Sequence, residues 1–166
     1  MSGLIAEKKA IEVLEACRAA GLMLATAESC TGGMIAASIT DIGGSSDVFD
    51  RGFVTYSNEA KEQMLGVPRA LIADHGAVSA EVARAMATGA LQNSRAGIAV
   101  SVTGIAGPGG GSPEKPVGLV WFGLARHGSE PIAAKHLFKD DGRESIRRAA
   151  VDAALELILQ GLKKTG

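Results

Sequence analysis

The stretch Leu22-Met23-Leu24-Ala25-Thr26-Ala27, followed at once by Glu28-Ser29-Cys30-Thr31-Gly32-Gly33, decides the fold of this chain. Its first half is short, apolar and uninterrupted, which is typical of a strand buried on both faces of a sheet. Residues 31–40 then have a helical composition. The sequence therefore predicts a strand that passes through a turn at Ser29 into a helix.

Segments on both sides of this turn alternate between helical and strand-like patterns. Gly21 ends an amphipathic helix that begins near residue 4, and Gly66-Val67-Pro68 ends a second helix that Asn58 caps. A third helix follows Ser79, and a fourth begins where Asp141 and Glu144 form a capping-box pattern. Strands are expected at 51–56, 96–102, 118–125 and 133–138.

Strands interleaved with helices are typical of α/β proteins. We therefore expect residues 1–166 to form a single three-layer α/β/α domain. The last two strands follow each other directly through Gly128, which indicates a hairpin. The sheet should thus be mixed and mostly parallel.

Composition excludes several classes of function. Seventeen basic and 18 acidic residues nearly cancel and aromatic residues make up 4% of the chain, which argues against nucleic-acid binding. No apolar run of about 20 residues and no leader-like start occur, so we expect a cytoplasmic protein with no membrane contact. Two cysteines and three scattered histidines predict no metal site.

Lys61 has an unusual position on the helix expected from Asn58 onward. At 100° per residue it falls on the face of Ala60, Met64 and Leu65, and it lies in the first turn, where the helix dipole disfavours a cation. Burial and the dipole both lower the pKa of a lysine, so Lys61 could act as a neutral base. Alternatively, its aliphatic stem covers the core while its ammonium group reaches solvent.

Ser29 follows the buried strand at the mouth of the next helix, where its hydroxyl can be presented at the sheet edge. Gly32 and Gly33 allow close backbone approach, and free N–H groups in the first turn of the helix could bind an oxyanion or a phosphate. Alternatively, Ser29 or Thr31 only caps the helix. Cys30 is a competing nucleophile or a small buried apolar residue, whereas Glu28 either orients a partner or forms a salt bridge.

Other polar residues are expected near the same edge. Tyr56 ends the second strand just before Lys61, and Thr103 ends a buried strand, where α/β proteins usually contact ligands. The glycine-rich loop 104–116 matches neither a P-loop nor a dinucleotide fingerprint. Arg143, at the start of the last helix, could hold a phosphate or could simply be solvated.

Four ordered motifs carry a resemblance that spans nearly the whole chain. They are Ala27-Glu28-Ser29-Cys30-Thr31-Gly32-Gly33, Gly52-Phe53-Val54-Thr55-Tyr56-Ser57-Asn58-Glu59-Ala60-Lys61, Gly76-Ala77-Val78-Ser79 and Ser101-Val102-Thr103-Gly104-Ile105-Ala106-Gly107-Pro108. In these motifs the chain resembles the CinA C-terminal domain family. Stand-alone members of that family look like nicotinamide-nucleotide amidases, which convert nicotinamide mononucleotide to nicotinic acid mononucleotide and ammonia in pyridine-nucleotide salvage.

The resemblance implies a set of site residues. Ser29 would be the nucleophile and Lys61 the base, with Tyr56 also in catalysis. We expect substrate contacts from six residues: Thr31, Gly32, Gly33, Thr103, Gly104 and Arg143. No metal or organic cofactor is expected for this chemistry.

Two other interpretations stay open at this point. The chain could be a non-catalytic nucleotide-binding or regulatory module, or an amidase that uses the Cys30 thiol. The expected partner is a small nucleotide, and a small domain with several apolar helices is also compatible with a homo-oligomer.

Overall fold

The computed structural model describes residues 2–163 of the chain. Its elements follow one another as α1 (Ser2–Ala20), β1 (Leu24–Glu28), α2 (Met34–Thr40), η1 (Ser45–Asp47), β2 (Phe49–Val54), α3 (Asn58–Leu65), α4 (Arg69–His75), α5 (Ala80–Gln92), β3 (Ile98–Gly104), β4 (Leu119–Arg126), β5 (Ile132–Leu137) and α6 (Arg143–Lys163).

The strands form one five-stranded sheet in the order β2-β1-β3-β4-β5. β1 pairs in parallel with β2 and β3, whereas β4 is antiparallel to both β3 and β5. Four strands therefore run in the same direction and β4 runs against them. The predicted mixed, mostly parallel sheet is confirmed, including the hairpin between the last two strands.

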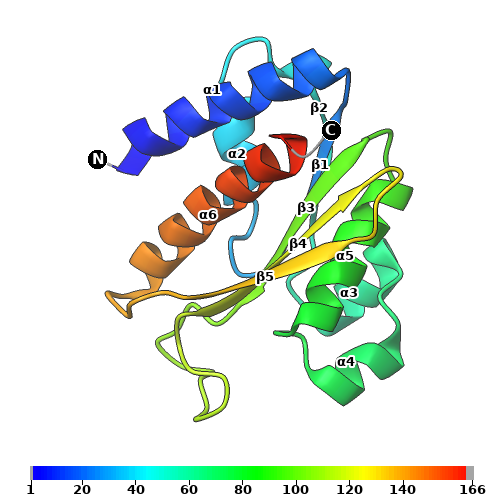
Figure 1. Ribbon diagram of the computed structural model, residues 1–166. Coiled ribbons are helices and arrows are strands. Elements are labelled where there is room, and N and C mark those ends of the chain that lie inside the picture. The colour runs from blue at the N-terminus through cyan, green and yellow to red at the C-terminus, as the bar shows by residue number, and fades with distance from the viewer. Residues whose placement is uncertain (1, 164–166) are drawn as a thin grey trace.

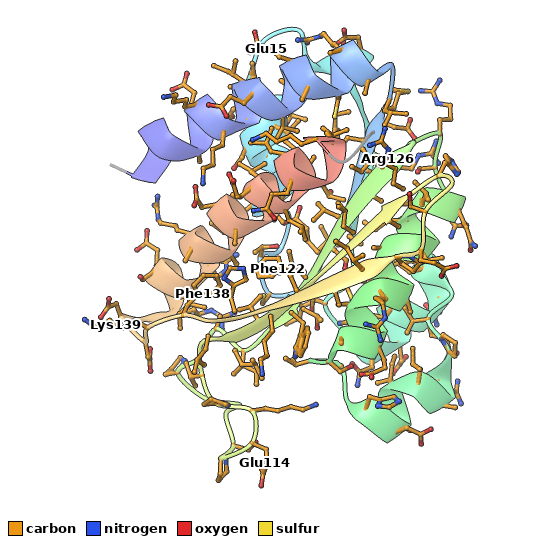
Figure 2. The ribbon with its side chains drawn as sticks, in the orientation of Figure 1. Glu15, Glu114, Phe122, Arg126, Phe138 and Lys139 are labelled. Atoms are coloured by element: carbon orange, nitrogen blue, oxygen red, sulfur yellow. The ribbon has the colours of Figure 1, made fainter. Side chains whose placement is uncertain are left out.

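Helices cover both faces of the sheet, as predicted (Figure 1). One face packs against α1, α2 and α6 in a core that includes Leu14, Ile35 and Ile158, all essentially inaccessible to solvent. In Figure 2, Phe122 and Phe138 lie between the sheet and α6. The other face packs mainly against α5, with Met86 at the centre of a smaller core. The architecture is thus a three-layer α/β/α sandwich.

Several element boundaries differ from the predicted ones for local reasons. Ser57, rather than Asn58, caps α3, because its hydroxyl accepts a hydrogen bond from the N–H of Ala60. The predicted capping box of Asp141 and Glu144 is wrong: Glu144 is paired with Arg148 one turn further along, and α6 begins at Arg143.

One helix was not predicted at all. Residues Arg69–His75 form α4, in which no residue is buried. The segment is short, and its Leu71 and Ile72 are only partly buried against the smaller core, so it lacks the apolar periodicity by which helices are recognised in a sequence.

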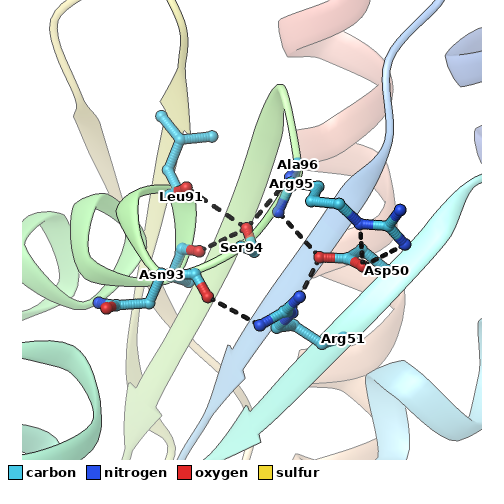
Figure 3. A network of polar contacts seen from close by, with 8 residues as sticks. Asp50, Arg51, Leu91, Asn93, Ser94, Arg95 and Ala96 are labelled. Carbon is cyan, nitrogen blue, oxygen red and sulfur yellow. Dashed lines mark hydrogen bonds and ion pairs between the residues drawn. The ribbon is translucent and has the colours of Figure 1, made fainter.

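A polar network joins the beginning of β2 to the connection between α5 and β3 (Figure 3). The Asp50 carboxylate accepts hydrogen bonds from the Arg51 guanidinium at 2.9 Å and from the Arg95 backbone N–H at 2.9 Å. The Arg95 guanidinium binds the same carboxylate at 3.1 Å. These contacts fix the end of the sheet that lies away from the strand-to-helix turn at Ser29.

A helix must be both long and apolar to span a membrane. Within residues 2–163, none is both long and apolar enough to cross a bilayer.

Candidate active site

Ser29 and Lys61 meet at the carboxyl end of β1. The Nζ atom of Lys61 lies 3.0 Å from the Oγ atom of Ser29, although 32 positions separate the two residues in the chain. Ser29 directly follows the last residue of β1, and Lys61 lies in the first turn of α3, which follows β2. Because β1 and β2 are parallel neighbours, their carboxyl ends bring these two residues to one edge of the sheet.

Lys61 is buried with only neutral oxygen atoms around its amine. The residue is 1% exposed, and Nζ donates to the backbone carbonyls of Thr55 at 2.9 Å and Tyr56 at 3.4 Å. Among the ion pairs of residues 2–163, none joins Lys61 to a carboxylate. Burial therefore lowers the pKa of Lys61 from its ordinary value of 10.5. Lys61 lies on a buried face of its helix with Leu65, as predicted, whereas Met64, which was assigned to the same face, is 43% exposed.

Glu28 organises the turn that carries Ser29. Its buried carboxylate accepts hydrogen bonds from the Thr31 hydroxyl at 2.5 Å and from the N–H groups of Gly33 at 3.2 Å, Ile35 at 2.9 Å and Ala36 at 3.0 Å. A carboxylate at the beginning of a helix also interacts favourably with the helix dipole. Glu28 thus has the orienting role considered for it, and the proposed salt bridge is not among the described ion pairs.

The glycine pair allows this turn, and the N–H groups of both glycines are used by the protein itself. Gly32 has a φ of 57° and Gly33 a φ of 106°, both in the left-handed region that favours glycine. The Gly32 N–H donates to the Ser29 carbonyl at 3.0 Å, and that of Gly33 donates to Glu28. Both donors therefore already have partners within the protein, and the substrate contacts expected of Gly32 and Gly33 stay a prediction.

Tyr56 and Arg143 lie together beside Ser29 and Lys61, which we call the dyad. The Nη2 atom of Arg143 donates to the Tyr56 hydroxyl at 3.2 Å, and its Nη1 atom donates to the carbonyl of Gly107 at 2.7 Å. Tyr56 is 64% exposed, and its backbone carbonyl, not its hydroxyl, contacts Lys61. Arg143 therefore links the exposed tyrosine to the glycine-rich loop.

Three other predicted contact residues are held by the protein itself. The Thr31 side chain is fully buried on Glu28, and the Thr103 hydroxyl donates to the carbonyl of Ala77 at 2.9 Å. A side chain at Gly104 would collide with Val120. Any contact of Thr31 with a ligand is accordingly restricted to its backbone, whereas Thr103 positions the segment that leads into α5.

Cys30 lies next to the nucleophile but is poorly suited to reaction. It is 6% exposed, and burial raises the pKa of its thiol to about 11. A thiol with such a pKa is almost wholly protonated near neutral pH, and the thiolate is the reactive form. Cys30 behaves here as a small apolar residue of the core.

Arg147 belongs to the same region and was not identified from the sequence. From α6 it donates to the carbonyl of Cys30 through Nε at 3.0 Å and to that of Thr31 through Nη2 at 3.3 Å. Its position four residues after Arg143 places both arginines on one face of the helix, beside the buried Ile146 and Ala150. That spacing was the only signal in the sequence that could have indicated it.

A groove between α1, α2 and α6 lies beside this site. Met34, Ser38 and Arg143 are among the residues that line it, but neither Ser29 nor Lys61 does. Arg143 is the one predicted site residue that the groove shares with the dyad region.

This chain is similar in sequence to known proteins over most of its length. The model of the CinA C-terminal domain matches residues 6–162. The nicotinamide-nucleotide amidohydrolase PncC of Escherichia coli (strain K12) is 54% identical over 149 residues, which cover 90% of this chain and 90% of that protein. A CinA-like protein of Citrifermentans bemidjiense is 66% identical over 139 residues, covering 84% of this chain and 33% of that longer protein.

Solved structures give the same result. The competence/damage-inducible protein CihA from Agrobacterium tumefaciens superposes with a TM-score of 0.92 at 50% identity, and the match covers 96% of both chains. A CinA superfamily protein from Escherichia coli superposes with a TM-score of 0.89 at 34% identity, covering 93% of this chain and 89% of that one. Sequence and fold therefore agree over almost the full length of this chain.

Proposed function

The chain belongs to the CinA C-terminal domain family, and we propose that it hydrolyses the carboxamide of nicotinamide mononucleotide to nicotinic acid mononucleotide and ammonia. The observation that carries a hydrolytic function is the 3.0 Å contact between Ser29 and a buried lysine that has no carboxylate partner among the described ion pairs. The choice of substrate rests on the name of the relative from Escherichia coli and on the resemblance that the four sequence motifs carry.

The hydrogen bonds around Lys61 suit a neutral amine. A neutral amine has two N–H donors and one lone pair, and the carbonyls of Thr55 and Tyr56 can accept the two donors. The lone pair is then left for the hydroxyl of Ser29, so that Ser29 is the donor in the reactive form. This is the arrangement in which a lysine activates a serine nucleophile.

In the first half of the proposed reaction, Lys61 takes the proton of Ser29 as the Oγ atom bonds to the carboxamide carbon. The carbonyl electrons move onto oxygen and form a tetrahedral oxyanion. The Lys61 ammonium then gives its proton to the amide nitrogen, the carbon–nitrogen bond breaks, and ammonia leaves. An ester between Ser29 and the nicotinate group remains.

In the second half, water attacks this ester while Lys61 accepts a proton from the water. The carbon–oxygen bond to Ser29 breaks, and Ser29 recovers its proton from Lys61. Arg143 and the glycine-rich loop that it contacts are the proposed phosphate-binding surface, because a guanidinium presents paired donors to phosphate oxygens. A cytoplasmic location and a place in pyridine-nucleotide salvage belong to the same proposal.

The second candidate function is a nucleotide-binding or regulatory module without catalysis. It would need the pocket but not the dyad, and a buried lysine without a counter-ion costs stability that a binding module has no reason to retain. The Cys30 thiol amidase is disfavoured by the burial of Cys30 and its raised pKa.

Ammonia release from a panel of pyridine nucleotides tests the proposal. We expect the wild-type protein to act on nicotinamide mononucleotide and Ser29→Ala to lose activity by about 10⁴-fold or more, as serine hydrolases do without their nucleophile. Ammonia release by Ser29→Ala at the wild-type rate would contradict the mechanism. Calorimetric binding of the mononucleotide without any product would instead support the binding module.

A further inference from the structure

The N–H groups of the turn after Ser29 are almost all used by the protein itself. Those of Ser29, Gly32 and Met34 donate to the carbonyls of Val102, Ser29 and Thr31, respectively. Those of Gly33, Ile35 and Ala36 donate to the carboxylate of Glu28. The oxyanion of the proposed reaction must therefore find its donors elsewhere in the turn.

Two N–H groups in this turn, those of Cys30 and Thr31, donate to no oxygen atom within residues 2–163, and that of Cys30 interacts with its own thiol. They belong to the two peptide groups that directly follow the nucleophile. In a planar trans peptide the N–H and C=O bonds point in opposite directions, so fixing a carbonyl also fixes the direction of the N–H across the same peptide.

The carbonyls of both peptides are fixed by hydrogen bonds. The Ser29 carbonyl, which shares a peptide with the Cys30 N–H, accepts from Gly32 at 3.0 Å. The Cys30 carbonyl, which shares a peptide with the Thr31 N–H, accepts from the Nε atom of Arg147 at 3.0 Å. Arg147 also binds the next carbonyl, that of Thr31, so one guanidinium spans two successive peptides.

On this basis we infer that Arg147 is a positioning residue, which holds the peptide after Cys30 so that the Thr31 N–H, with the Cys30 N–H, stabilises the oxyanion formed at Ser29. This inference rests on the proposed amide hydrolysis. Arg147 donates to the carbonyl oxygens of Cys30 and Thr31, and its positive charge polarises the peptide and strengthens the Thr31 donor. The role predicted for Thr31 in substrate binding is thereby assigned to its backbone.

The turn after Ser29 is held from two directions. Glu28 fixes it from the end of β1 through neutral donors, and Arg147 fixes it from α6, 117 positions away from Cys30 in the chain. Oxyanion donors act well only when they are rigidly oriented before the reaction begins. A side chain that approaches from a different layer of the fold supplies that rigidity.

The first test compares Arg147→Met and Arg147→Lys with matched changes at Arg126. Arg126 also donates to a backbone carbonyl, that of Gly161 at 3.1 Å, but lies at the opposite end of the sheet. We expect Arg147→Met to lower kcat by about 10²-fold, as the loss of an oxyanion donor does, with KM nearly unchanged. Arg147→Lys should fall between Arg147→Met and wild type, because one ammonium cannot span both carbonyls as the planar guanidinium does.

Thermal unfolding and chemical rescue separate positioning from a structural effect. Arg126→Met should lose stability comparably to Arg147→Met but retain the wild-type kcat, and added guanidinium ion should restore part of kcat only to Arg147→Met. A folded Arg147→Met protein with the wild-type kcat, or one in which only KM rises, would overturn the inference. If Arg147→Met does not fold, the same test applies to Arg147→Lys: a wild-type kcat, or a change in KM alone, would overturn the inference.

A fluorophosphonate probe tests the inference independently of the natural substrate. Ser29 displaces fluoride from phosphorus, its proton passes to Lys61, and the phosphoryl oxygen occupies the position of the oxyanion. We expect Ser29 to be labelled at least about tenfold more slowly in Arg147→Met than in wild type. Equal labelling rates would refute the role of Arg147. Failure of the wild-type protein to release ammonia would instead refute the proposed substrate while leaving this comparison valid.

Discussion

Two ionisable side chains are buried at opposite ends of β2, and their surroundings differ in kind. The Asp50 side chain, at the beginning of the strand, is 3% exposed and is matched by the guanidinium groups of Arg51 and Arg95. Lys61 follows the end of the strand and is 1% exposed, yet it contacts only neutral oxygen atoms. The Asp50 carboxylate is thus paired with two cations, whereas Lys61 has no counter-ion among the described ion pairs.

This difference separates a structural cluster from a reactive one. The pKa of Asp50 is lowered, first by the hydrogen bond from the Arg95 backbone N–H, so its carboxylate stays ionised and holds the chain together. The pKa of Lys61 is lowered by burial, which favours the neutral amine. Only a neutral amine can accept the proton of a serine hydroxyl. The lack of a counter-ion is therefore what makes Lys61 usable as a base.

Replacing Lys61 by Met should give the largest effect. Met has a similar length and no charge, so we expect ammonia release to fall by about 10⁴-fold, since Ser29 loses its base. The folded protein should not be destabilised, because the change removes an uncompensated buried amine. Activity assays and thermal unfolding of the same preparation measure both effects.

The stability gain of Lys61→Met should also depend on pH in a defined direction. A lysine whose pKa is lowered in the folded state costs stability below its ordinary pKa, and this cost grows as the pH falls toward the lowered value. The variant should therefore gain most over wild type at neutral and acidic pH, and least near pH 10.5. A marked loss of stability at neutral pH would mean that the lysine has a partner that stabilises its charge.

Replacing Asp50 by Asn should lower stability but leave activity nearly unchanged, the opposite of Lys61→Met. The kcat for ammonia release should stay within about twofold of wild type, whereas the free energy of unfolding should fall by about 1 to 3 kcal/mol through weakened charge-assisted hydrogen bonds. Since the pKa of Asp50 is lowered, its contribution is present above the ordinary carboxyl pKa of 3.8 and is lost as the pH falls through the lowered value. Denaturant unfolding at neutral pH and below pH 3 measures this contribution. A large loss of kcat in Asp50→Asn would show that Asp50 also supports catalysis, and would contradict its purely structural role.

Replacing Cys30 by Ala should give the smallest effect on activity. Its thiol is buried and has a pKa of about 11, so it supplies neither the nucleophile nor a proton acceptor near neutral pH. We expect kcat within about threefold of wild type and a modest loss of stability from the smaller side chain. If instead Cys30→Ala were inactive while Ser29→Ala remained active, the thiol amidase would be the correct mechanism.

The sequence predicted those features that depend on local pattern. The helix wheel placed Lys61 on a buried face, and the apolar run before Ser29 identified the central strand and its turn. Both signals are contained in a few neighbouring residues. The fold class followed from the alternation of such segments.

Features that depend on contacts between distant segments were missed or misassigned. The partners of the N–H groups in this turn were not foreseen: that of Gly32 donates to the Ser29 carbonyl and that of Gly33 to Glu28, which turns back onto the beginning of α2. Arg147 reaches the turn from α6 only after the layers pack. Helix α4 escaped prediction for the different reason that it is short and none of its residues is fully buried.

The protonation state of Lys61 tests this account most directly. Selective ¹³Cε labelling of lysine, with the signal of Lys61 assigned by its disappearance in Lys61→Met, would allow the amine to be titrated in the folded protein. We expect a midpoint clearly below the ordinary lysine pKa of 10.5, with the acid limb of kcat/KM following the same midpoint. A midpoint at or above 10.5 would show that Lys61 is a cation at neutral pH, and would contradict its role as the base for Ser29.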